Sequence, residues 1–269
     1  KETGLDVGVG FTPYQNAHFI FLLPHSIIAV SLVTALLPRI SRLAADTQIS
    51  NVRDEIQQTL LNLYSLIIPA AFAMLFLGQP IAHLIFAASN SADASQIGMI
   101  LSGFALGLIP FCSSYVMLRG FYAFEDTKTP AAITLLMNVV TILCATISYL
   151  VLPIRFITVG IAVSFGIGYL SSSLLARFLL SKRIGRLNIR KELVSILFIS
   201  FTAFAPGLLI SSQIESVLNA GAPNAFTSLL TLVVAGAIAL PIFLGIGYVL
   251  KVSSILALAA SLKKKLAKR

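Results

Sequence analysis

The stretch AAITLLMNVVTILCATISYLVL, from Ala131 to Leu152, contains no charged residue and decides the solvent in which this chain folds. A segment of about 20 apolar residues is long enough to cross the hydrocarbon core of a bilayer as an α-helix. Hydrocarbon offers no hydrogen-bond partners, so every backbone N–H and C=O must be satisfied within the segment, and a helix does this. We therefore predict a membrane-spanning helix here.

Similar apolar stretches recur along the whole chain. With 57% hydrophobic and 11% charged residues, the sequence has more apolar surface than a soluble core can hide. The stretches do not alternate between polar and apolar residues as barrel strands do. A shorter apolar segment, Pro80–Ser89, is expected to form an interfacial or re-entrant helix. We predict an all-α integral membrane protein with about seven transmembrane helices, at Tyr14–Leu37, Leu60–Leu77, Gln96–Leu118, Ala131–Leu152, Ile157–Leu180, Leu193–Ser211 and Ala225–Leu250.

Basic residues gather in alternate loops. They follow the first span, separate the third from the fourth and the fifth from the sixth, and close the chain, whereas the opposite loops carry only Lys1 and Arg155. The positive-inside rule then places the N-terminus of this sequence outside and its C-terminus in the cytoplasm. The net charge of +9 therefore mostly reflects the orientation of the chain in the membrane and does not indicate a nucleic-acid-binding surface. The tail SLKKKLAKR is able to bind anionic lipid headgroups.

The residues that enzymes need are not visible in the spans. Charged groups persist at membrane depth only for function, and these spans contain almost none. There is no Ser/His/Asp arrangement, pair of carboxylates or glycine-rich phosphate loop. Cys112 and Cys144 have no neighbouring His or Asp in sequence, so we expect packing roles and no metal site. We therefore predict no catalytic residue and no cofactor, and transport is the expected class.

The first span contains two histidines, His18 and His25, on either side of Pro24. A spacing of seven residues puts both on one face of a helix. Imidazoles prefer water or a polar partner to lipid, so this face is expected to line a cavity, with a substrate or proton role as a further hypothesis. His18 can equally lie near the outer interface.

Two helix-shaping patterns accompany the histidines. Gly103 and Gly107 match the GxxxG spacing of close helix contacts, a weak signal in an apolar sequence. Prolines inside spans remove helical hydrogen bonds and introduce kinks, which transporters use, although proline is also simply commoner in membrane helices. These prolines are Pro24, Pro69, Pro110, Pro206 and Pro241.

Two basic-side loops carry the sharpest motifs. After the first span, ALLPRISRLAA places Arg39 and Arg42 on one face of a short continuation helix. After the third span comes RGFYAFEDTKTP, which begins at Arg119. Its Asp126 and Lys128 are candidates for a gate pair, or are solvated charges at a helix junction. Thr129 is expected to cap the next helix, and Pro130 fits its first turn.

At these loops the chain resembles the MurJ, or MviN, family of lipid II flippases, within the multidrug/oligosaccharidyl-lipid/polysaccharide exporter superfamily. The matching residues are Leu23 and Pro24, TALLPRISRLAA from Thr34 to Ala45, and GFYAFEDTKTP from Gly120 to Pro130. The form of the second motif looks like the actinobacterial branch.

The resemblance implies a place within a larger transporter. Members of the family have fourteen helices, in two six-helix lobes followed by two additional helices, and this chain matches the C-terminal half. Residues 1–181, with five spans, then correspond to most of the C-terminal transport lobe. Residues 182–192 correspond to a basic cytoplasmic loop, and residues 193–269 to the two additional helices and a basic tail.

The resemblance also implies a function. Family members move undecaprenyl-linked peptidoglycan precursor, lipid II, across the bacterial cytoplasmic membrane by alternating access, coupled to membrane potential or an ion gradient. The implied partners are lipid II, membrane lipids and the N-terminal lobe that this sequence lacks. Alternatives are an exporter of another polyprenyl-linked glycan or a drug, and a truncated noncatalytic membrane scaffold.

The sequence departs from the family pattern at the expected substrate site. Proteobacterial members carry an Asp-Arg pair and a Glu before the Leu-Pro motif, whereas here those positions are His18, Phe19 and Leu22. His18 is a candidate stand-in for the missing arginine.

The charge distribution generates a topology prediction. A reporter fused after Arg269 should behave as cytoplasmic, and a cysteine introduced between Gln213 and Asn224 should react with an impermeant thiol reagent in intact cells, because basic loops remain inside. Replacing Cys112 and Cys144 by Ala removes background labelling. Labelling that requires permeabilised cells would contradict the predicted orientation.

Overall fold

The computed structural model describes residues 10–87, 91–217, 224–257 and 260. Within these ranges the chain is helical, and seven helical segments are long and apolar enough to cross a membrane, as predicted. The elements are α1 (Phe11–Pro24), η1 (His25–Ala29), α2 (Val30–Ala45), α3 (Ile49–Ile85), α4 (Ser91–Tyr122), α5 (Lys128–Val151), α6 (Ile154–Ile184), α7 (Arg190–Phe204), α8 (Pro206–Val217) and α9 (Ala225–Val249).

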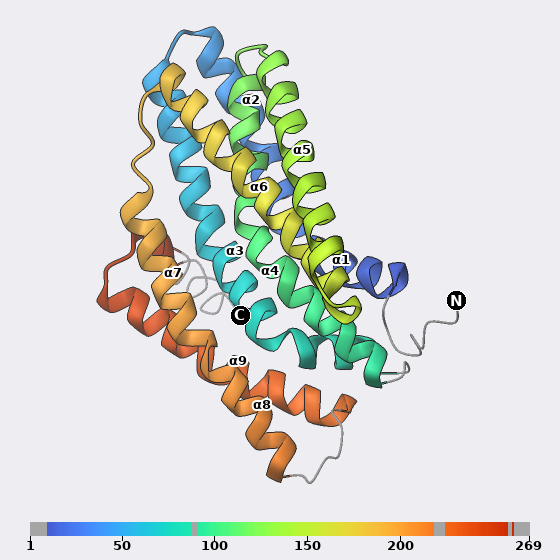
Figure 1. Ribbon diagram of the computed structural model, residues 1–269. Helices are drawn as coiled ribbons and strands as arrows, with labels where there is room; N and C mark the ends of the chain where they lie inside the picture. Colours follow the sequence, from blue (N-terminus) through green and yellow to red (C-terminus); the bar gives the residue numbers. More distant parts are fainter. Residues whose placement is uncertain (1–9, 88–90, 218–223, 258–259, 261–269) are drawn as a thin grey trace.

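Helix α4 forms the centre of the bundle. It packs against α3 on one side, α6 on another and α1 on a third (Figure 1). In the most hydrophobic segment of α4, 67% of the residues are buried, whereas 6% are buried in the corresponding segment of α5. Helix α5 packs along α6 and leaves most of its apolar surface uncovered. Helix α5 therefore lies at the edge of the described bundle, with an apolar surface that needs lipid or another helix to cover it.

Helix α3 is longer than the predicted second span at both ends. Its first turns are polar but bury Val52 and Ile56 completely, so packing extends the helix beyond the apolar stretch. At the other end, a short helix follows a kink, as predicted for Pro80–Ser89, but it begins earlier and is joined directly to the longer part of α3. Pro80 lies inside α3, which kinks at Leu77 (φ −114°, ψ 18°) and continues to Ile85, and residues 88–90 lie outside the described part.

The predicted sixth span is divided between two helices. Helix α7 ends at Phe204 and α8 begins at Pro206, because proline has no N–H to continue the hydrogen-bond ladder. Helices α7 and α9 pack together on the outside of α3 (Figure 1). Asn224 begins α9 with a capping box, in which its side chain accepts a hydrogen bond from the backbone N–H of Thr227 at 3.0 Å. Of the predicted loop 213–224, residues 213–217 belong to α8, and 218–223 lie outside the described residues.

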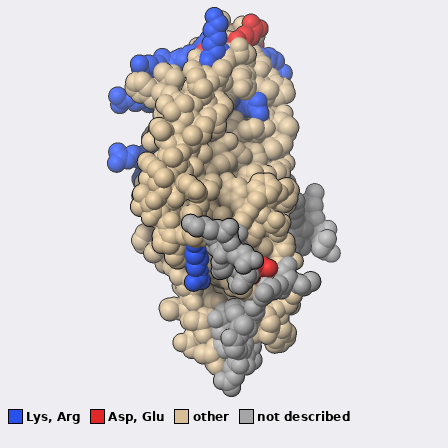
Figure 2. Space-filling view, turned by 45° about the vertical axis from the view of Figure 1, so that its right-hand side comes forward, with Lys and Arg blue, Asp and Glu red and all other residues tan. Residues whose placement is uncertain are grey.

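Charge is concentrated at one end of the molecule. Figure 2 shows Lys and Arg side chains mainly at its upper end, where α2 meets α3, α4 meets α5, and α6 ends. We call this the basic end. Of the predicted basic loop 182–192, only residues 185–189 lie outside helices, because α6 extends to Ile184 and α7 begins at Arg190.

The GxxxG face of α4 is a close helix contact. A Cβ atom added to Gly107 would lie 2.7 Å from the Cα atom of Gly166 on α6, so the two backbones touch. One added to Gly103 would lie 3.2 Å from the carbonyl oxygen of Val159. Small residues at such sites allow the dispersion contacts that hold helices together in lipid. The weak sequence signal therefore corresponds to a real interface.

This contact generates a stability prediction. Gly107→Ala should lower the free energy of unfolding by about 1–3 kcal/mol, because the methyl group would force two backbones apart. Gly236→Ala is the matched control, since nothing lies within 4 Å of the added atom, and a helical alanine is intrinsically favoured. Unfolding of the purified chains in detergent measures both. Equal stability of the two variants would contradict the proposed contact.

Candidate functional site

The first membrane span changes its helical geometry at the predicted histidine pair. Pro24 ends α1, and the next turn, His25–Ala29, is a π-helix in which the N–H of Val30 donates to the carbonyl of His25. Proline disturbs the regular ladder because it lacks an N–H and crowds the preceding turn. A single π turn inside an α-helix is frequent at functional sites. Pro24 is thus followed by a wider helical turn.

His18 lies in a cluster of aromatic rings at the interface of α1, α4 and α6. The imidazole is half-buried. Rings of this kind pack favourably at centroid separations of about 4.5–7 Å. The centroid of His18 lies 5.3 Å from Phe104, 5.8 Å from Phe165, 5.9 Å from Phe21 and 6.4 Å from Tyr14.

His25 lies on the same side of the first span and is almost enclosed. Only 8% of it is exposed. It stacks on Phe111 at 4.1 Å between centroids and meets the edge of Tyr115 at 4.9 Å. Its Nδ1 lies 3.5 Å from the Sγ of Cys112, so this cysteine has a histidine neighbour that the sequence did not reveal. His25 therefore lies in a helix interface of this chain, and a cavity-lining position in the complete transporter stays a prediction.

Tyr115 connects this interface to the basic end. One turn along α4, the guanidinium of Arg119 lies 4.5 Å from the centre of the Tyr115 ring and 5.3 Å from that of Tyr122. The Nε of Arg119 is buried and has no hydrogen-bond partner among the described residues. Cation–π contacts of this type are worth about 0.5–2 kcal/mol, depending on how dry the site is. His25, Tyr115 and Arg119 therefore form a continuous series of contacts that sequence reasoning missed.

The ion pair of Asp126 is formed with Arg183 and not with Lys128, which agrees with the alternative of charges at a helix junction. Asp126 also accepts hydrogen bonds from the backbone N–H of Thr129 at 3.0 Å and from its hydroxyl at 2.8 Å. Arg183, at the end of α6, lies 3.2 Å from the same carboxylate. The hydrogen bonds from Thr129, with a smaller effect of Arg183, hold the pKa of Asp126 below its usual value. Asp126, and not Thr129, thus supplies the capping acceptor for α5, and Lys128 is exposed.

The two arginines of the α2 motif differ in their surroundings. Arg39 forms an ion pair with Glu55 of α3. Arg42 is exposed in the last turn of α2, where a positive charge is favourable to the helix dipole. Both belong to a helix that continues directly from the first span, as expected. Beside this turn, a cavity of about 450 Å³ is lined by Ser41, Ala44, Ala45, Tyr122, Ala123, Phe124 and Glu125.

A second polar series crosses from α4 to α6. Gln96 donates to the carbonyl of Arg155 at 3.0 Å and to the hydroxyl of Thr158 at 3.2 Å. Nearer the basic end, Ser114 donates to Ser172 at 3.1 Å. These small polar groups satisfy one another inside the bundle, as hydrocarbon requires. No group of three or more possible metal ligands occurs among the described residues.

Comparison with known proteins identifies this architecture. The profile of the family described as lipid II flippase MurJ matches residues 6–250. A probable lipid II flippase MurJ from Bdellovibrio bacteriovorus is 28% identical over 85% of this chain and 43% of its own length. A lipid II flippase MurJ from Burkholderia cenocepacia is 29% identical over 66% of this chain and 34% of its own length.

A solved structure has the same fold. The structure described as lipid II flippase MurJ, inward closed conformation, matches 89% of this chain and 47% of its own chain, with a TM-score of 0.67 and 22% identity. The chain therefore spans less than half the length of these relatives. Since the family profile covers most of the sequence, this multi-pass membrane chain belongs to the MurJ lipid II flippase family.

Proposed function

We propose that this chain is the C-terminal part of a flippase that moves undecaprenyl-linked peptidoglycan precursor across the bacterial cytoplasmic membrane. The observation that carries the proposal is the family match over residues 6–250. The substrate would be moved by alternating access, in which two lobes rock around a shared site near the middle of the bilayer. In this proposal the N-terminal lobe is the partner that completes the site, and no cofactor takes part.

The proposed division of labour follows the helices. The spans from α1 to α6 would form most of one transport lobe, and α7 to α9 the appended pair. Packing supports this division, because α7 and α9 contact α3 and each other at the outside of the bundle. The proposed orientation puts the basic end in the cytoplasm, since Lys and Arg are favoured on that side. Membrane potential or an ion gradient would supply the driving force.

We assign different roles to the two histidines. His18 is half-buried and keeps part of its surface available to a ligand, so it is the candidate contact for the lipid-linked anion. His25 is 8% exposed and packs against Phe111 and Tyr115, so it would act by positioning α1 against α4. Phe19, which is exposed, lies about 100° around the helix from His18 and adds an apolar surface there.

The need for two lobes generates a first prediction. The 269-residue chain, purified and reconstituted alone in liposomes, should not transfer fluorescent lipid II between leaflets above the rate of empty vesicles, because only part of one lobe is present. A full-length relative reconstituted in parallel is the positive control. Robust transfer by the short chain would contradict the two-lobe requirement.

The assignment of His18 generates a second prediction, tested in the complete transporter. His18→Leu should reduce flipping about tenfold or more, because a hydrogen bond to a charged group is worth about 1.5–3 kcal/mol. His18→Arg should preserve flipping by keeping a cation, and His18→Asn should show whether polarity alone suffices. Growth of a flippase-depleted bacterium, together with the amount of each protein in the membrane, provides the measurement.

Ile27→Leu is the matched control on the same span, since Ile27 is 69% exposed and carries no charge. It should leave growth unchanged. Full growth with His18→Leu would remove the anion-binding role of His18, whatever the other variants do.

A further inference from the structure

A basic pocket lies where α6 ends and the connection to α7 begins. It has a volume of about 320 Å³. Arginine guanidinium groups bind phosphate through paired hydrogen bonds. The pocket offers two such arginines beside three apolar side chains and Ser181, whose hydroxyl donates to the carbonyl of Phe178 at 2.8 Å. The lining residues are Leu174, Arg177, Phe178, Ser181, Arg186 and Leu187.

The wall of this pocket is fixed to the rest of the bundle. The chain leaves α6 at Gly185, whose φ of 89° is a conformation that glycine adopts without strain. Leu187 is then 5% and Ile189 1% exposed, so both anchor the connection in the core. Between them, the backbone N–H of Asn188 donates to the side chain of Gln57 on α3 at 2.7 Å. The connection is thus held at three successive points.

This wall orients one of the two arginines. The Nη2 of Arg177 donates to the carbonyl oxygen of Leu187 at 3.3 Å, which leaves its remaining N–H donors for another acceptor. Arg186 is exposed at the rim. The ion pairs of the described residues join Arg39 to Glu55, Arg53 to Asp54 and Arg183 to Asp126, so neither Arg177 nor Arg186 is neutralised by a described carboxylate. The pocket therefore favours an anion.

An apolar stripe leads from this pocket along α6 into the membrane. Phe178, Leu174, Leu170 and Ile167 follow one another at three- and four-residue spacings, and they are 56%, 61%, 49% and 43% exposed. At 1.5 Å per residue the stripe is about 16 Å long, close to half of the roughly 30 Å hydrocarbon core. Its length therefore matches the acyl chains of one leaflet.

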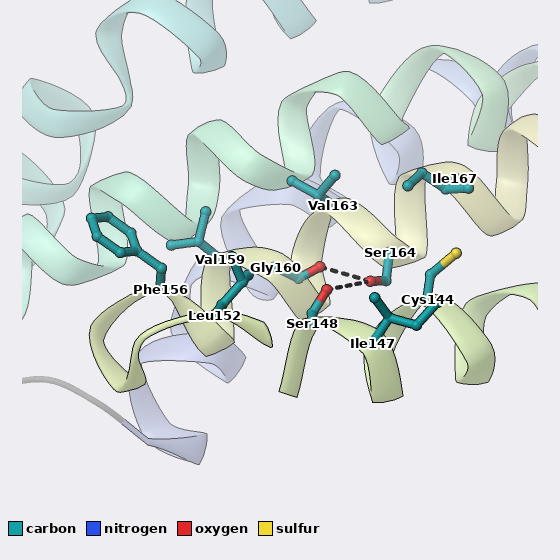
Figure 3. A pocket seen from close by; sticks show the side chains of 10 residues that line it. All are labelled: Cys144, Ile147, Ser148, Leu152, Phe156, Val159, Gly160, Val163, Ser164 and Ile167. Atoms are coloured by element: carbon teal, nitrogen blue, oxygen red, sulfur yellow. Dashed lines mark hydrogen bonds between the residues drawn. The ribbon is translucent and has the colours of Figure 1, made fainter. Parts of the chain in front are cut away.

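The stripe ends at a groove between α5 and α6. Figure 3 shows this groove with Ile167 and Cys144 at one end and Phe156 at the other. Its volume is about 460 Å³. The hydroxyl of Ser164 donates to the carbonyl of Gly160 at 2.7 Å and lies 3.3 Å from that of Ser148, so these polar atoms are already satisfied. What remains for a ligand is an apolar surface suited to the end of an acyl chain.

We propose that an anionic phospholipid of the leaflet at the basic end binds along α6. Its phosphate lies between Arg177 and Arg186, and an acyl chain follows the stripe from Phe178 to Ile167 and reaches the near end of the groove. Basic pockets beside membrane helices recognise lipid phosphates through charge, and the apolar stripe adds contact that a free phosphate cannot make. This site is independent of the flipping activity proposed above.

The absence of Trp from the chain allows a direct test. A single tryptophan at Leu170 reports the lipid that touches the stripe, through quenching by phospholipids brominated in their acyl chains. The full chain is reconstituted in vesicles that contain brominated phosphatidylglycerol or brominated phosphatidylcholine in an unbrominated background. We expect the Leu170→Trp chain to bind phosphatidylglycerol on the order of tenfold more strongly than phosphatidylcholine.

A second tryptophan chain measures the general lipid surface. Ile142→Trp places the reporter on α5, where Ile142 is 64% exposed. Its depth is matched, because Ile142 follows the start of α5 at Lys128 by as many residues as Leu170 precedes the end of α6 at Ile184. This chain should show no more than about a twofold preference. An equal preference at both positions would mean bulk attraction to a basic protein and would overturn the proposed site.

Charge removal locates the phosphate. In the Leu170→Trp chain, the double change Arg177→Gln and Arg186→Gln should abolish the preference for phosphatidylglycerol. The double change Arg190→Gln and Lys191→Gln removes the same charge from exposed positions nearby and should leave the preference intact. Loss of preference in the second variant, or its persistence in the first, would overturn the assignment to this pocket.

The source of the anion is tested by competition. Inorganic phosphate added to the Leu170→Trp vesicles should not relieve quenching by brominated phosphatidylglycerol, because the acyl chain contributes to binding. Relief at millimolar phosphate would identify a site for a free anion and overturn the lipid proposal.

Discussion

The close approach of α4 to its neighbours is the constraint on which the remaining structure depends. In hydrocarbon, lipid tails solvate apolar side chains as well as a helix does, so packing distance and shape decide which helices associate. Gly107 and Gly166 let the backbones of α4 and α6 touch. On the α3 side, a Cβ atom added to Gly78 would lie 2.8 Å from the carbonyl oxygen of Gly98 on α4. The polar bridges of Gln96 and Ser114 can form only because these contacts bring α6 so near.

Most of the architecture could be predicted from the sequence, because a bilayer reduces the choice to helices of sufficient length. The number of spans and the separation of basic from apolar segments followed from that rule. Helix ends could not be predicted in the same way. Val52 and Ile56 extend α3 through tertiary packing, and the kink at Leu77 depends on Pro80 together with the contact between Gly78 and α4. The hydropathy of the sequence shows neither this packing nor this contact.

The candidate site was predictable only where the signal was local. A spacing of seven correctly placed His18 and His25 on one side of the first span. Their different exposure depends on side chains far along the chain, since Phe111 and Phe165 come from α4 and α6. For the same reason, the sequence offered only the neighbouring Lys128 as a candidate partner of Asp126, whereas its ionic partner Arg183 lies at the end of another helix. The role of His18 stays a prediction.

The π turn at His25–Ala29 affects which faces of the first span point toward its neighbours. Its upstream part, α1, packs mainly against α4, whereas its downstream part, α2, packs mainly against α3. A uniform helix advances by about 100° per residue and would fix the two faces relative to each other. The wider turn changes the angle between the two faces, so one continuous span packs against two neighbours that lie in different directions. Inserting or deleting one residue there would rotate α2 by about 100° relative to α1 and would turn the side chains that now face α3 away from it.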